Sequence, residues 1–459
     1  MADDASEPHL VTSTSAILFF GGVLVFVASA HVVSTLETLG ASLVYRKDLL
    51  QDYLAARAVM DGKDPYQPMT VLRAAYLHGV DGALAFPHPT PHPPPAVLLT
   101  LPLGLTTYPR AAAAWLFLAY LLLVGCTVLV ARHVIGKQSK GAPFALAVLV
   151  LATCPVRDDL VLGQFTVVIL ALLTGAYLAL TVRREVLGGL FLGAAVSLKF
   201  LGWPIVLFYA WKRRWGVVLG AAAALLVTHA ACAVVMPEAI SRYYTAVAPR
   251  ASEDYWASDR NISVWTLGQR CFGGLHSQVT VNTVNAPPFF ELRWFALRAG
   301  TIAAAATFLF FMCAAAKLSD QCDGFLVMLS ASTVLNPIAW EIYLTLLFLP
   351  LAVVGHRLAQ RSWPPRASVA FVGLLIMLIA LKTPQAVLIG DGTESNVTAL
   401  RALVTAVPML WPLTTAWAVI RSASPVPSAS RLAGLAPGRR GLTPMPVTSV
   451  RKSVRGTRK

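Results

Sequence analysis

Residues 14–35 read TSAILFFGGVLVFVASAHVVST, an apolar run without a single Asp, Glu, Lys or Arg, and the polar cluster RKDLLQDY follows at 46–53. A helix needs about 20 consecutive apolar residues to cross the hydrocarbon core of a bilayer. Similar runs recur along the 459-residue chain, which is 56% hydrophobic and 13% charged. Soluble domains carry about 25% charged residues. The sequence therefore predicts an all-α polytopic membrane protein.

The apolar runs set the expected topology. We expect about 11–13 transmembrane helices, drawn from the runs 14–35, 94–106, 110–132, 141–156, 160–181, 187–198, 200–211, 216–236, 296–316, 323–339, 341–356, 367–382 and 400–420. Longer polar stretches at 36–93, 237–295 and 383–399 are expected to form outer loops carrying short amphipathic helices. If the first two of these loops face the same side, an even number of crossings must separate them, yet seven runs lie between them. Either 94–106 does not cross, or 187–211 is one bent helix.

Charge favours a plasma-membrane protein over a nucleic-acid-binding one. The net charge of +15 lies largely in short loops and at the C-terminal end, as the positive-inside rule expects of cytoplasmic segments. The acidic start of residues 1–13 is unlike a signal peptide, so we expect a cytoplasmic N-terminus and a retained first span. Residues 422–459 hold too few apolar residues to fold and predict a disordered basic tail. The six cysteines form no CxxC pair and predict neither a disulfide framework nor a metal cluster.

Two carboxylates in the first polar loop are the strongest candidates for chemistry. Asp48 and Asp52 lie four residues apart and would share one face of a helix. The apolar residues around them predict an amphipathic helix on the membrane surface that ends near Gly62. Arg46 and Lys47 supply cations beside the acids. The pattern fits either a catalytic site or the solvated face of a surface helix.

Further polar candidates stand out against apolar surroundings. The proline-rich segment 86–95 predicts a stiff entry into the membrane, and its His88 and His92 lack the spacing and the partners of a metal site. Gln164 at the start of a span could cap or pack. Lys199 stands alone in an apolar stretch, which marks either a functional site or a side chain that snorkels to the interface. If the flanking basic clusters at 183–184 and 212–214 are cytoplasmic, Lys199 lies on the Asp48 side.

The second long loop and a late break in the apolar pattern complete the set. The loop interleaves Tyr, Trp and Arg residues, which suits sugar stacking and phosphate binding and equally suits an interfacial aromatic belt. Asn336-Pro337 interrupts a late span and places Glu341 near a membrane face, either as a functional group or as a boundary marker.

In their order along residues 10–420, these segments resemble the GT-C glycosyltransferases that use polyprenol-phosphate sugars, and glycosyltransferase family 87 in particular. That family includes actinobacterial α-mannosyltransferases and related arabinofuranosyltransferases. The matching segments are Asp48–Tyr66, His92–Leu103, Gly163-Gln164, Gly193–Lys199, Asn261-Ile-Ser263 and Asn336–Glu341. Two positions depart from the family pattern, since Ile342 replaces a histidine and His92 replaces a tyrosine.

The resemblance implies a reaction and a site. A polyprenyl-phosphate sugar would donate mannose, or else arabinofuranose, to a glycolipid or cell-envelope glycan on the extracytoplasmic face of the plasma membrane. The resemblance implies inversion at the sugar, with Asp48 as the general base and Asp52 in reserve. Substrate-binding residues are expected to be Arg46, Lys47, Tyr53, Tyr66, His92, Gln164, Lys199, Asn261, Arg270, Trp340 and Glu341.

Two other functions remain open on the sequence. A flippase of lipid-linked sugars would show inverted repeats and midplane polar groups, and a non-catalytic membrane protein would not need Asp48. A divalent metal ion is the one cofactor that the resemblance leaves open, although no ligand cluster besides the two loop acids suggests one.

Overall fold

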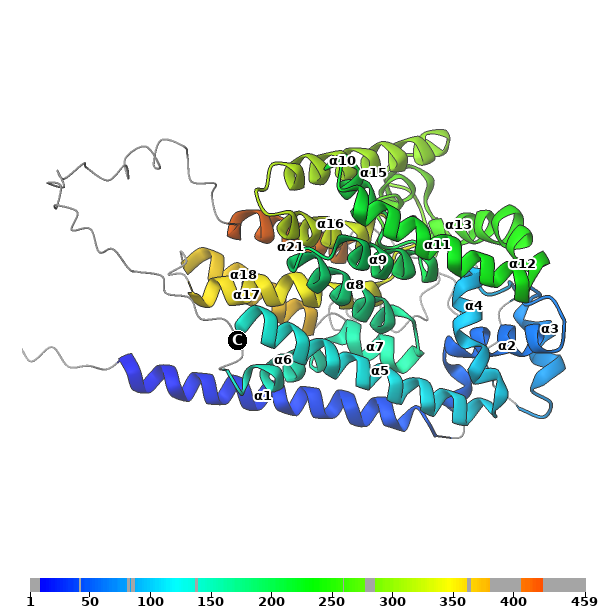
Figure 1. Ribbon diagram of the computed structural model, residues 1–459, viewed down its shortest axis with the longest axis horizontal. Helices are drawn as coiled ribbons and strands as arrows, with labels where there is room; N and C mark the ends of the chain where they lie inside the picture. The colour runs from blue at the N-terminus through cyan, green and yellow to red at the C-terminus, as the bar shows by residue number, and fades with distance from the viewer. Residues whose placement is uncertain are drawn as a thin grey trace, which may run out of the picture. The chain divides into compact units, whose positions relative to one another are not determined.

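The computed structural model describes residues 9–40, 43–80, 83, 87–136, 139–258, 260–276, 285–360, 365–379 and 406–423 (Figure 1). The described residues as far as Ala423 form one compact unit. The predicted loop at 383–399 and almost all of the predicted tail at 422–459 lie outside the described residues.

Helices make up nearly all of the described secondary structure. The first half of the chain holds α1 (His9–Glu37), η1 (Val44–Arg46), α2 (Leu49–Met60), α3 (Met69–Tyr76), α4 (Pro94–Thr100), η2 (Leu101–Leu105), α5 (Tyr108–Val130), η3 (Ala131–Ile135), α6 (Ala142–Leu151), α7 (Cys154–Leu162), α8 (Thr166–Thr181), α9 (Glu185–Leu198), α10 (Trp203–Trp211) and α11 (Trp215–Val235).

The second half continues with α12 (Pro237–Arg242), η4 (Tyr243–Val247), α13 (Ala248–Trp256), α14 (Thr266–Gly268), η5 (Gln269–Gly273), α15 (Arg293–Ala316), α16 (Gln321–Leu335), η6 (Glu341–Leu347), α17 (Phe348–Gln360), α18 (Pro365–Ile379), η7 (Val407–Met409) and α21 (Leu410–Ser422). Two short strands, β1 (Leu275–His276) and β2 (Asn285–Ala286), pair antiparallel with Leu275 opposite Ala286.

The predicted class, a helical polytopic membrane protein, is confirmed. Within the described residues, five helices are long and apolar enough to cross a membrane: Leu18–Glu37, Tyr108–Ile135, Trp215–Val235, Arg293–Ala316 and Glu341–Gln360. The pair α7 and α8 meets the same test but bends by 119°. Shorter apolar helices at Pro94–Leu105, Ala142–Leu151, Glu185–Leu198 and Gln321–Leu335 pack among the longer ones.

The segment 94–106 stays at the end of the bundle that holds the first loop. There α4 and η2 pack against α2: Arg57 donates a hydrogen bond to the Gly104 carbonyl (3.0 Å), and the Tyr53 hydroxyl donates to the Thr106 carbonyl (2.8 Å). The run 187–211 is two separate helices, α9 and α10. Taking 94–106 from the seven runs between the long loops leaves six, an even number, as two loops on one side require.

The two long loops meet at one end of the helices, where Figure 1 shows α2 and α3 beside α12 and α13. Arg242 of the second loop forms an ion pair with Asp64 of the first. The Tyr243 hydroxyl donates to the carbonyl of Pro91 (3.0 Å), and the Tyr243 ring lies 5.3 Å from that of Tyr66. Each contact joins residues more than 150 positions apart in the sequence, and together they bring the first and second long loops into one layer, called the polar layer below.

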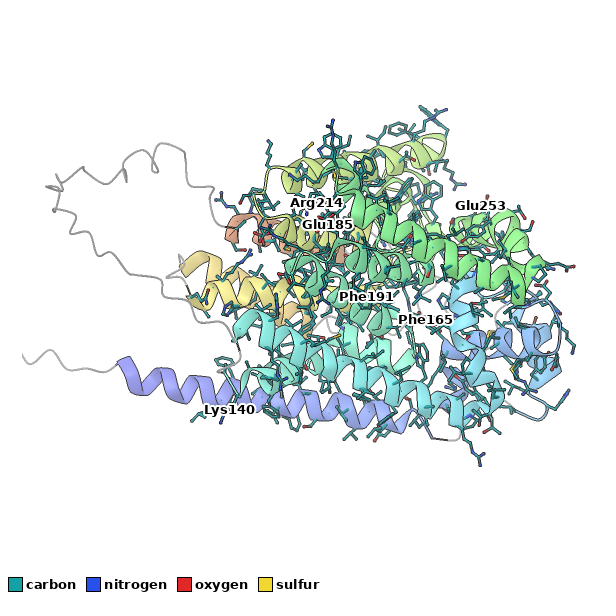
Figure 2. The ribbon with its side chains drawn as sticks, viewed as in Figure 1. Lys140, Phe165, Glu185, Phe191, Arg214 and Glu253 are labelled. Atoms are coloured by element: carbon teal, nitrogen blue, oxygen red, sulfur yellow. The ribbon has the colours of Figure 1, made fainter. Side chains whose placement is uncertain are left out.

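At the opposite ends of α9 and α11, Glu185 forms an ion pair with Arg214, and Figure 2 labels both residues close together. Lys212 next to this pair donates to the Ala316 carbonyl at 2.7 Å. The basic turns at 183–184 and 212–214 therefore lie together, as the sequence predicts for segments on one membrane side.

Glycines bring α9 and α11 into close contact. A Cβ atom added to Gly193 would lie 2.3 Å from the carbonyl oxygen of Ala221, and one added to Gly189 would lie 2.2 Å from that of Val217. On the facing helix, a Cβ at Gly220 would lie 2.3 Å from the carbonyl of Val186. Small residues at four-residue spacing allow such close packing of helices in membranes. This contact fixes the position of Lys199, which follows α9 directly.

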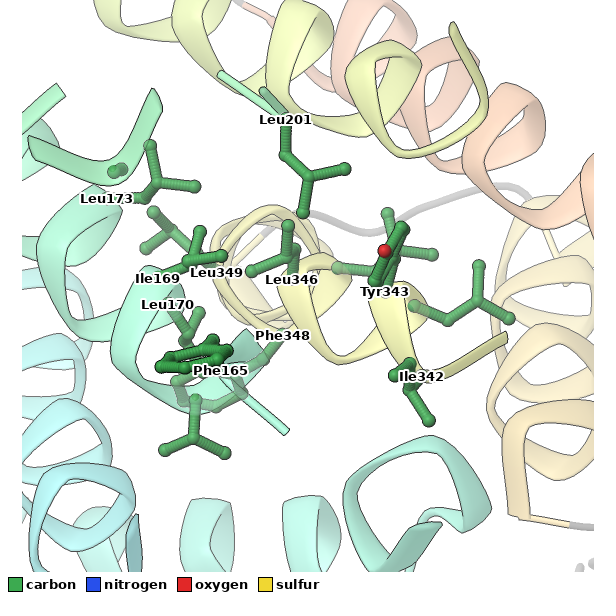
Figure 3. Packing of buried hydrophobic residues seen from close by; sticks show 14 of the residues in the cluster. Phe165, Ile169, Leu170, Leu173, Leu201, Ile342, Tyr343, Leu346, Phe348 and Leu349 are labelled. Carbon is green, nitrogen blue, oxygen red and sulfur yellow. The ribbon is translucent and has the colours of Figure 1, made fainter. Parts of the chain in front are cut away.

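The core behind the polar layer is apolar. Figure 3 shows Phe165 and the α8 side chains of Ile169, Leu170 and Leu173 lying near Tyr343 and Leu346 of η6. All six side chains are buried and belong to one hydrophobic cluster. The stretch before η6 is irregular, as Asn336-Pro337 predicts, and it brings η6 up to α8.

The solvated polar face predicted for α2 is wrong, because that face is covered by protein. Nine of its twelve residues are buried, including Gln51 and Asp52. The neighbouring segments α4, η2 and α5 cover the face on which water was expected, and the polar groups there pair with protein partners instead. The first loop is therefore part of the packed fold.

Candidate active site

Asp48 precedes the first turn of α2 and makes no capping hydrogen bond to that helix. Its side chain instead accepts a hydrogen bond through Oδ2 from Nε2 of Gln164, at 2.7 Å. Asp48 is only partly covered, whereas its neighbours Lys47 and Leu49 are buried. A carboxylate that is held at one oxygen and remains within reach of solvent can exchange a proton with a bound molecule.

A sharp bend in the backbone presents Gln164. Helix α7 ends at Gly163 in the left-handed conformation, with φ of 70°, which glycine adopts without strain. A Cβ there would also lie 2.9 Å from the Cβ of Leu49. The backbone N–H of Gln164 donates to the backbone carbonyl of Asp159 (3.0 Å), and α8 begins two residues later.

Lys199 completes a chain of three side chains. Its Nζ donates to Oε1 of Gln164 at 2.6 Å and lies 4.9 Å from the centre of the Tyr343 ring. The lysine is buried at 7% exposure. The negative charges of Asp159, Asp52 and Asp48 interact favourably with the Lys199 ammonium. The predicted position of Lys199 on the Asp48 side of the membrane agrees with this arrangement.

Asp52 lies in a different environment, one turn further along α2. It is 1% exposed, accepts a hydrogen bond from the Thr90 hydroxyl (3.3 Å), and contacts Nδ1 of His92 at 2.7 Å. The Tyr66 hydroxyl holds the His92 backbone by donating to its carbonyl at 2.9 Å. The stiff proline segment thus delivers His92 to a buried acid.

Aromatic side chains lie next to these polar groups. The Tyr255 ring is 5.3 Å from that of Trp340 and 5.8 Å from that of His88. The charge of Asp48 contributes to raising the pKa of Tyr255, after the larger effect of burial. Tyr255 and Trp340 come from separate loops and converge near the acid.

Burial raises the pKa of Asp48 above its usual value of 3.8. The Gln164 hydrogen bond and the charges of His92 and Lys199 oppose that rise, while Asp52 adds to it. Burial likewise lowers the pKa of Lys47, to about 8. Asp48 therefore keeps its proton to a higher pH than a free aspartate, which moves it toward the range of a general base.

The other predicted site residues are placed as follows. Lys47 Nζ donates to Thr38 Oγ1 (2.5 Å) and to the Val161 carbonyl (2.7 Å), so it ties the end of α1 to α7. The Tyr53 hydroxyl donates to the carbonyl of Thr106, the residue that follows η2. Arg46 is exposed at the end of η1, and Glu341 is partly exposed at the start of η6.

Asn261 and Arg270 organise the second loop. Asn261 is fully buried and links that loop to the break after α16, donating to the Pro337 carbonyl (2.8 Å) and accepting from the Ala339 amide (3.0 Å). Arg270 is also fully buried and donates to the Asn261 carbonyl at 3.0 Å. These hydrogen bonds join parts of the second loop to one another and to the segment after α16.

Three residues that contact the predicted site residues were not named as candidates from the sequence: Asp159 next to Gln164, Thr90 next to Asp52, and Tyr343 next to Lys199. Asp159 lies five residues before Gln164, and that proximity was a usable signal. Thr90 and Tyr343 could not be found, because their contacts join segments far apart in the chain.

A divalent metal ion finds no ready set of ligands among the described residues. No three His, Cys, Asp or Glu side chains there are close enough together to hold a metal ion. Asp52 already contacts His92, and Asp48 contacts an amide group.

Comparison with known proteins defines the class. The chain is a membrane glycosyltransferase: the model of "Glycosyltransferase family 87" matches residues 91–337, more than half of the chain. The chain belongs to glycosyltransferase family 87. A crystal structure of ArnT from Cupriavidus metallidurans bound to undecaprenyl phosphate aligns over 86% of this chain and 77% of its own, with 13% identity and a TM-score of 0.39. No curated protein matched the chain.

Proposed function

We propose that the protein transfers a sugar from a polyprenyl-phosphate donor to a glycolipid or cell-envelope glycan, with Asp48 as the general base. One observation carries the proposal. Asp48 is a partly exposed carboxylate whose Oδ2 is 2.7 Å from the Gln164 amide nitrogen, and the same amide group is 2.6 Å from the Lys199 ammonium. A base and a cation held by one residue suit a reaction that takes a proton and releases an anion.

The reaction proceeds by displacement. Asp48 accepts the proton of the acceptor hydroxyl while the oxygen of that hydroxyl forms a bond to the anomeric carbon. The bond from that carbon to the lipid phosphate breaks, and the phosphate leaves with the electron pair. Base catalysis contributes roughly 10²–10⁴-fold to such a step. Attack opposite the leaving group inverts the anomeric configuration, as the family resemblance implies.

Asp48 suits the role of base better than Asp52. Asp52 is 1% exposed and its carboxylate is occupied by His92 and Thr90. An acceptor hydroxyl would have to displace both partners to reach it. Asp52 and His92 instead support the loop from which Asp48 acts, with Tyr66 fixing the His92 backbone.

Cations near the base suit the departing phosphate. Lys199 belongs to the network, and Arg46 is exposed two residues before Asp48. Preorganised positive groups stabilise charge that develops in a transition state, often by several kcal/mol. Tyr255 and Trp340 offer ring faces against which a sugar can stack. Mannose is the favoured sugar and arabinofuranose the next.

The reaction takes place at the extracytoplasmic face of the plasma membrane. The basic turns at 183–184 and 212–214 lie at the end of the bundle away from Asp48, and the positive-inside rule favours the cytoplasm for them. That orientation supports the extracytoplasmic side for the two long loops and for the acceptor.

The test is a transfer assay with purified protein in lipid nanodiscs. Polyprenyl-phosphate mannose and polyprenyl-phosphate arabinose are supplied separately with a panel of glycolipid acceptors. We expect transfer of mannose, release of polyprenyl phosphate, and an inverted anomeric centre in the product by NMR. The same protein reconstituted in sealed vesicles tests the alternative: movement of intact donor across the bilayer without release of polyprenyl phosphate would replace this proposal with a flippase. A retained anomeric configuration would overturn the single-displacement mechanism.

A further inference from the structure

We propose that Gln164 is a positioning residue, locked by Lys199, that directs Oδ1 of Asp48 toward the acceptor hydroxyl. The inference rests on the proposed function, because it assigns a role relative to Asp48 as the base. Gln164 itself need not touch the substrate. Its side chain connects the proposed base, Asp48, to the cation of Lys199.

The chemistry of the three side chains allows a single arrangement. A lysine ammonium offers only donors, and an ionised carboxylate offers only acceptors. The carboxamide of Gln164 must therefore turn its Oε1 to Lys199 and its Nε2 to Asp48. The two contacts, at 2.6 and 2.7 Å, have this polarity. Turning the amide over would set donor against donor and acceptor against acceptor.

Other contacts hold both Lys199 and the backbone of Gln164, the residue that bridges Lys199 and Asp48. Lys199 is 7% exposed, lies against the Tyr343 ring, and follows α9, which is held by its glycine contact with α11. The Gln164 backbone is held by the bend at Gly163 and by the hydrogen bond to Asp159. The amide group is buried at 7% exposure. It therefore meets Asp48 in one orientation before any substrate binds.

The bridge separates the two oxygens of Asp48. Oδ2 accepts the Gln164 hydrogen bond, and among the described residues no hydrogen bond is made to Oδ1. Asp48 is partly exposed, so the uncommitted oxygen is the one that an incoming hydroxyl can reach. A fixed carboxylate reduces the orientational freedom that the transition state must otherwise remove.

Titratable groups on several neighbouring elements interact electrostatically with Asp48. The titratable groups that act with it are Asp52 on α2, His92 before α4, Tyr108 on α5, Lys199 after α9, Tyr255 on α13 and Tyr343 on η6. The Gln164 hydrogen bond favours the ionised form of Asp48. Its loss would shift the carboxyl further toward the protonated, inactive form.

The experiment compares Gln164→Met and Gln164→Glu with the parent protein. Both replacements have a length close to that of glutamine, and both lack the Nε2 donor. We expect kcat to fall by about 10- to 100-fold, the usual worth of a hydrogen bond to a charged group. The acidic limb of the kcat–pH profile should move up by about one pH unit. Gln164→Glu should move it further, because a second carboxylate faces Asp48.

A spectroscopic titration separates this inference from the proposed function. The infrared carboxyl band of Asp48, identified by its absence in Asp48→Asn, reports protonation without any turnover. We expect its midpoint to rise in both Gln164 variants and to stay at the parent value in Gln67→Met, a control in the first loop whose amide donates to the Asp64 carbonyl.

An unchanged Asp48 midpoint and an unchanged acidic limb in the Gln164 variants would overturn the positioning role, even where Asp48→Asn abolishes transfer. Full activity of Asp48→Asn would overturn the proposed base instead. Reduced yield of folded protein with an unshifted titration would assign Gln164 to packing, which also contradicts the inference.

Discussion

The two acids of the first loop differ in what surrounds them, although one helical turn separates them. Asp52 is enclosed by Thr90 and His92, while Asp48 is partly exposed. The same residue type can therefore serve packing at one position and chemistry at the other. Burial and hydrogen bonding decide the role, as they do for paired carboxylates in general.

Asp52→Ala should destabilise the protein more than Asp48→Ala does. Removing the Asp52 carboxylate leaves the buried Thr90 and His92 side chains without this acceptor, at a cost of about 1–3 kcal/mol. Asp48 is partly covered, so water can replace it. Thermal unfolding in detergent measures both variants side by side. Equal midpoints for the two variants would contradict the assignment of Asp52 to the framework.

The pH dependence of transfer should report Asp48. Burial raises its pKa above 3.8, and the protonated form cannot accept a proton, so kcat/KM should fall as the pH is lowered through that raised pKa. The profile is measured with saturating acceptor and varied donor. An activity that persists undiminished down to pH values near 3.8 would show that no raised carboxyl controls the reaction.

Sequence reasoning found Asp48, Gln164 and Lys199 one at a time, because each stands out as a polar residue in an apolar context. It could not predict that they contact one another, since hydrogen-bond partners depend on how distant segments pack. It also grouped Asn261 and Arg270 with the substrate-binding residues, which stays a prediction, but it did not foresee the hydrogen bonds that link Asn261 to Pro337 and Ala339. Residue type alone did not reveal which polar groups were already satisfied.

Among the elements, the contact of α9 with α11 does most to position the cation. Gly193→Ala should disturb it, because the new Cβ would lie 2.3 Å from the Ala221 carbonyl oxygen. Overpacking of this kind costs about 1–3 kcal/mol. Gly125→Ala in α5 is the matched control, since its Cβ would meet nothing within 4 Å.

The expected result is a lower unfolding midpoint and weaker donor binding for Gly193→Ala, with Gly125→Ala like the parent. A Gly193→Ala protein as stable and active as the parent would show that the helices separate easily. Element boundaries agree with most of the apolar runs, although the run 160–181 is broken between α7 and α8, and the polar face of α2 is buried instead of solvated. A short apolar pattern does not distinguish a membrane surface from a protein interior.

At the scale of the whole molecule, the contact between the two long loops supports one shared side of the membrane for both. The count of apolar runs between these loops is odd, and the packing of 94–106 onto α2 favours an even number of crossings. A single apolar run does not show whether it crosses the membrane, because a run of 12 or 13 residues suits either a short span or a buried helix.

Side-specific labelling tests this topology. Single cysteines introduced at the exposed positions Arg46 and Glu253 should react with an impermeant maleimide from the extracytoplasmic side. Cysteines at Lys140 and Arg213, also exposed, should react only from the cytoplasmic side. A background without the six natural cysteines supplies the control. Labelling of Arg46→Cys and Glu253→Cys from opposite sides would contradict the shared polar layer.

The most direct measurement is the turnover of Asp48→Asn in nanodiscs with the polyprenyl-phosphate sugar that the parent protein uses. Asparagine keeps the shape of the side chain and removes the base. We expect kcat to fall by about 10²–10⁴-fold while donor KM changes little. An Asp48→Asn protein that transfers sugar at the parental rate would contradict the central claim that this carboxylate takes the proton of the acceptor.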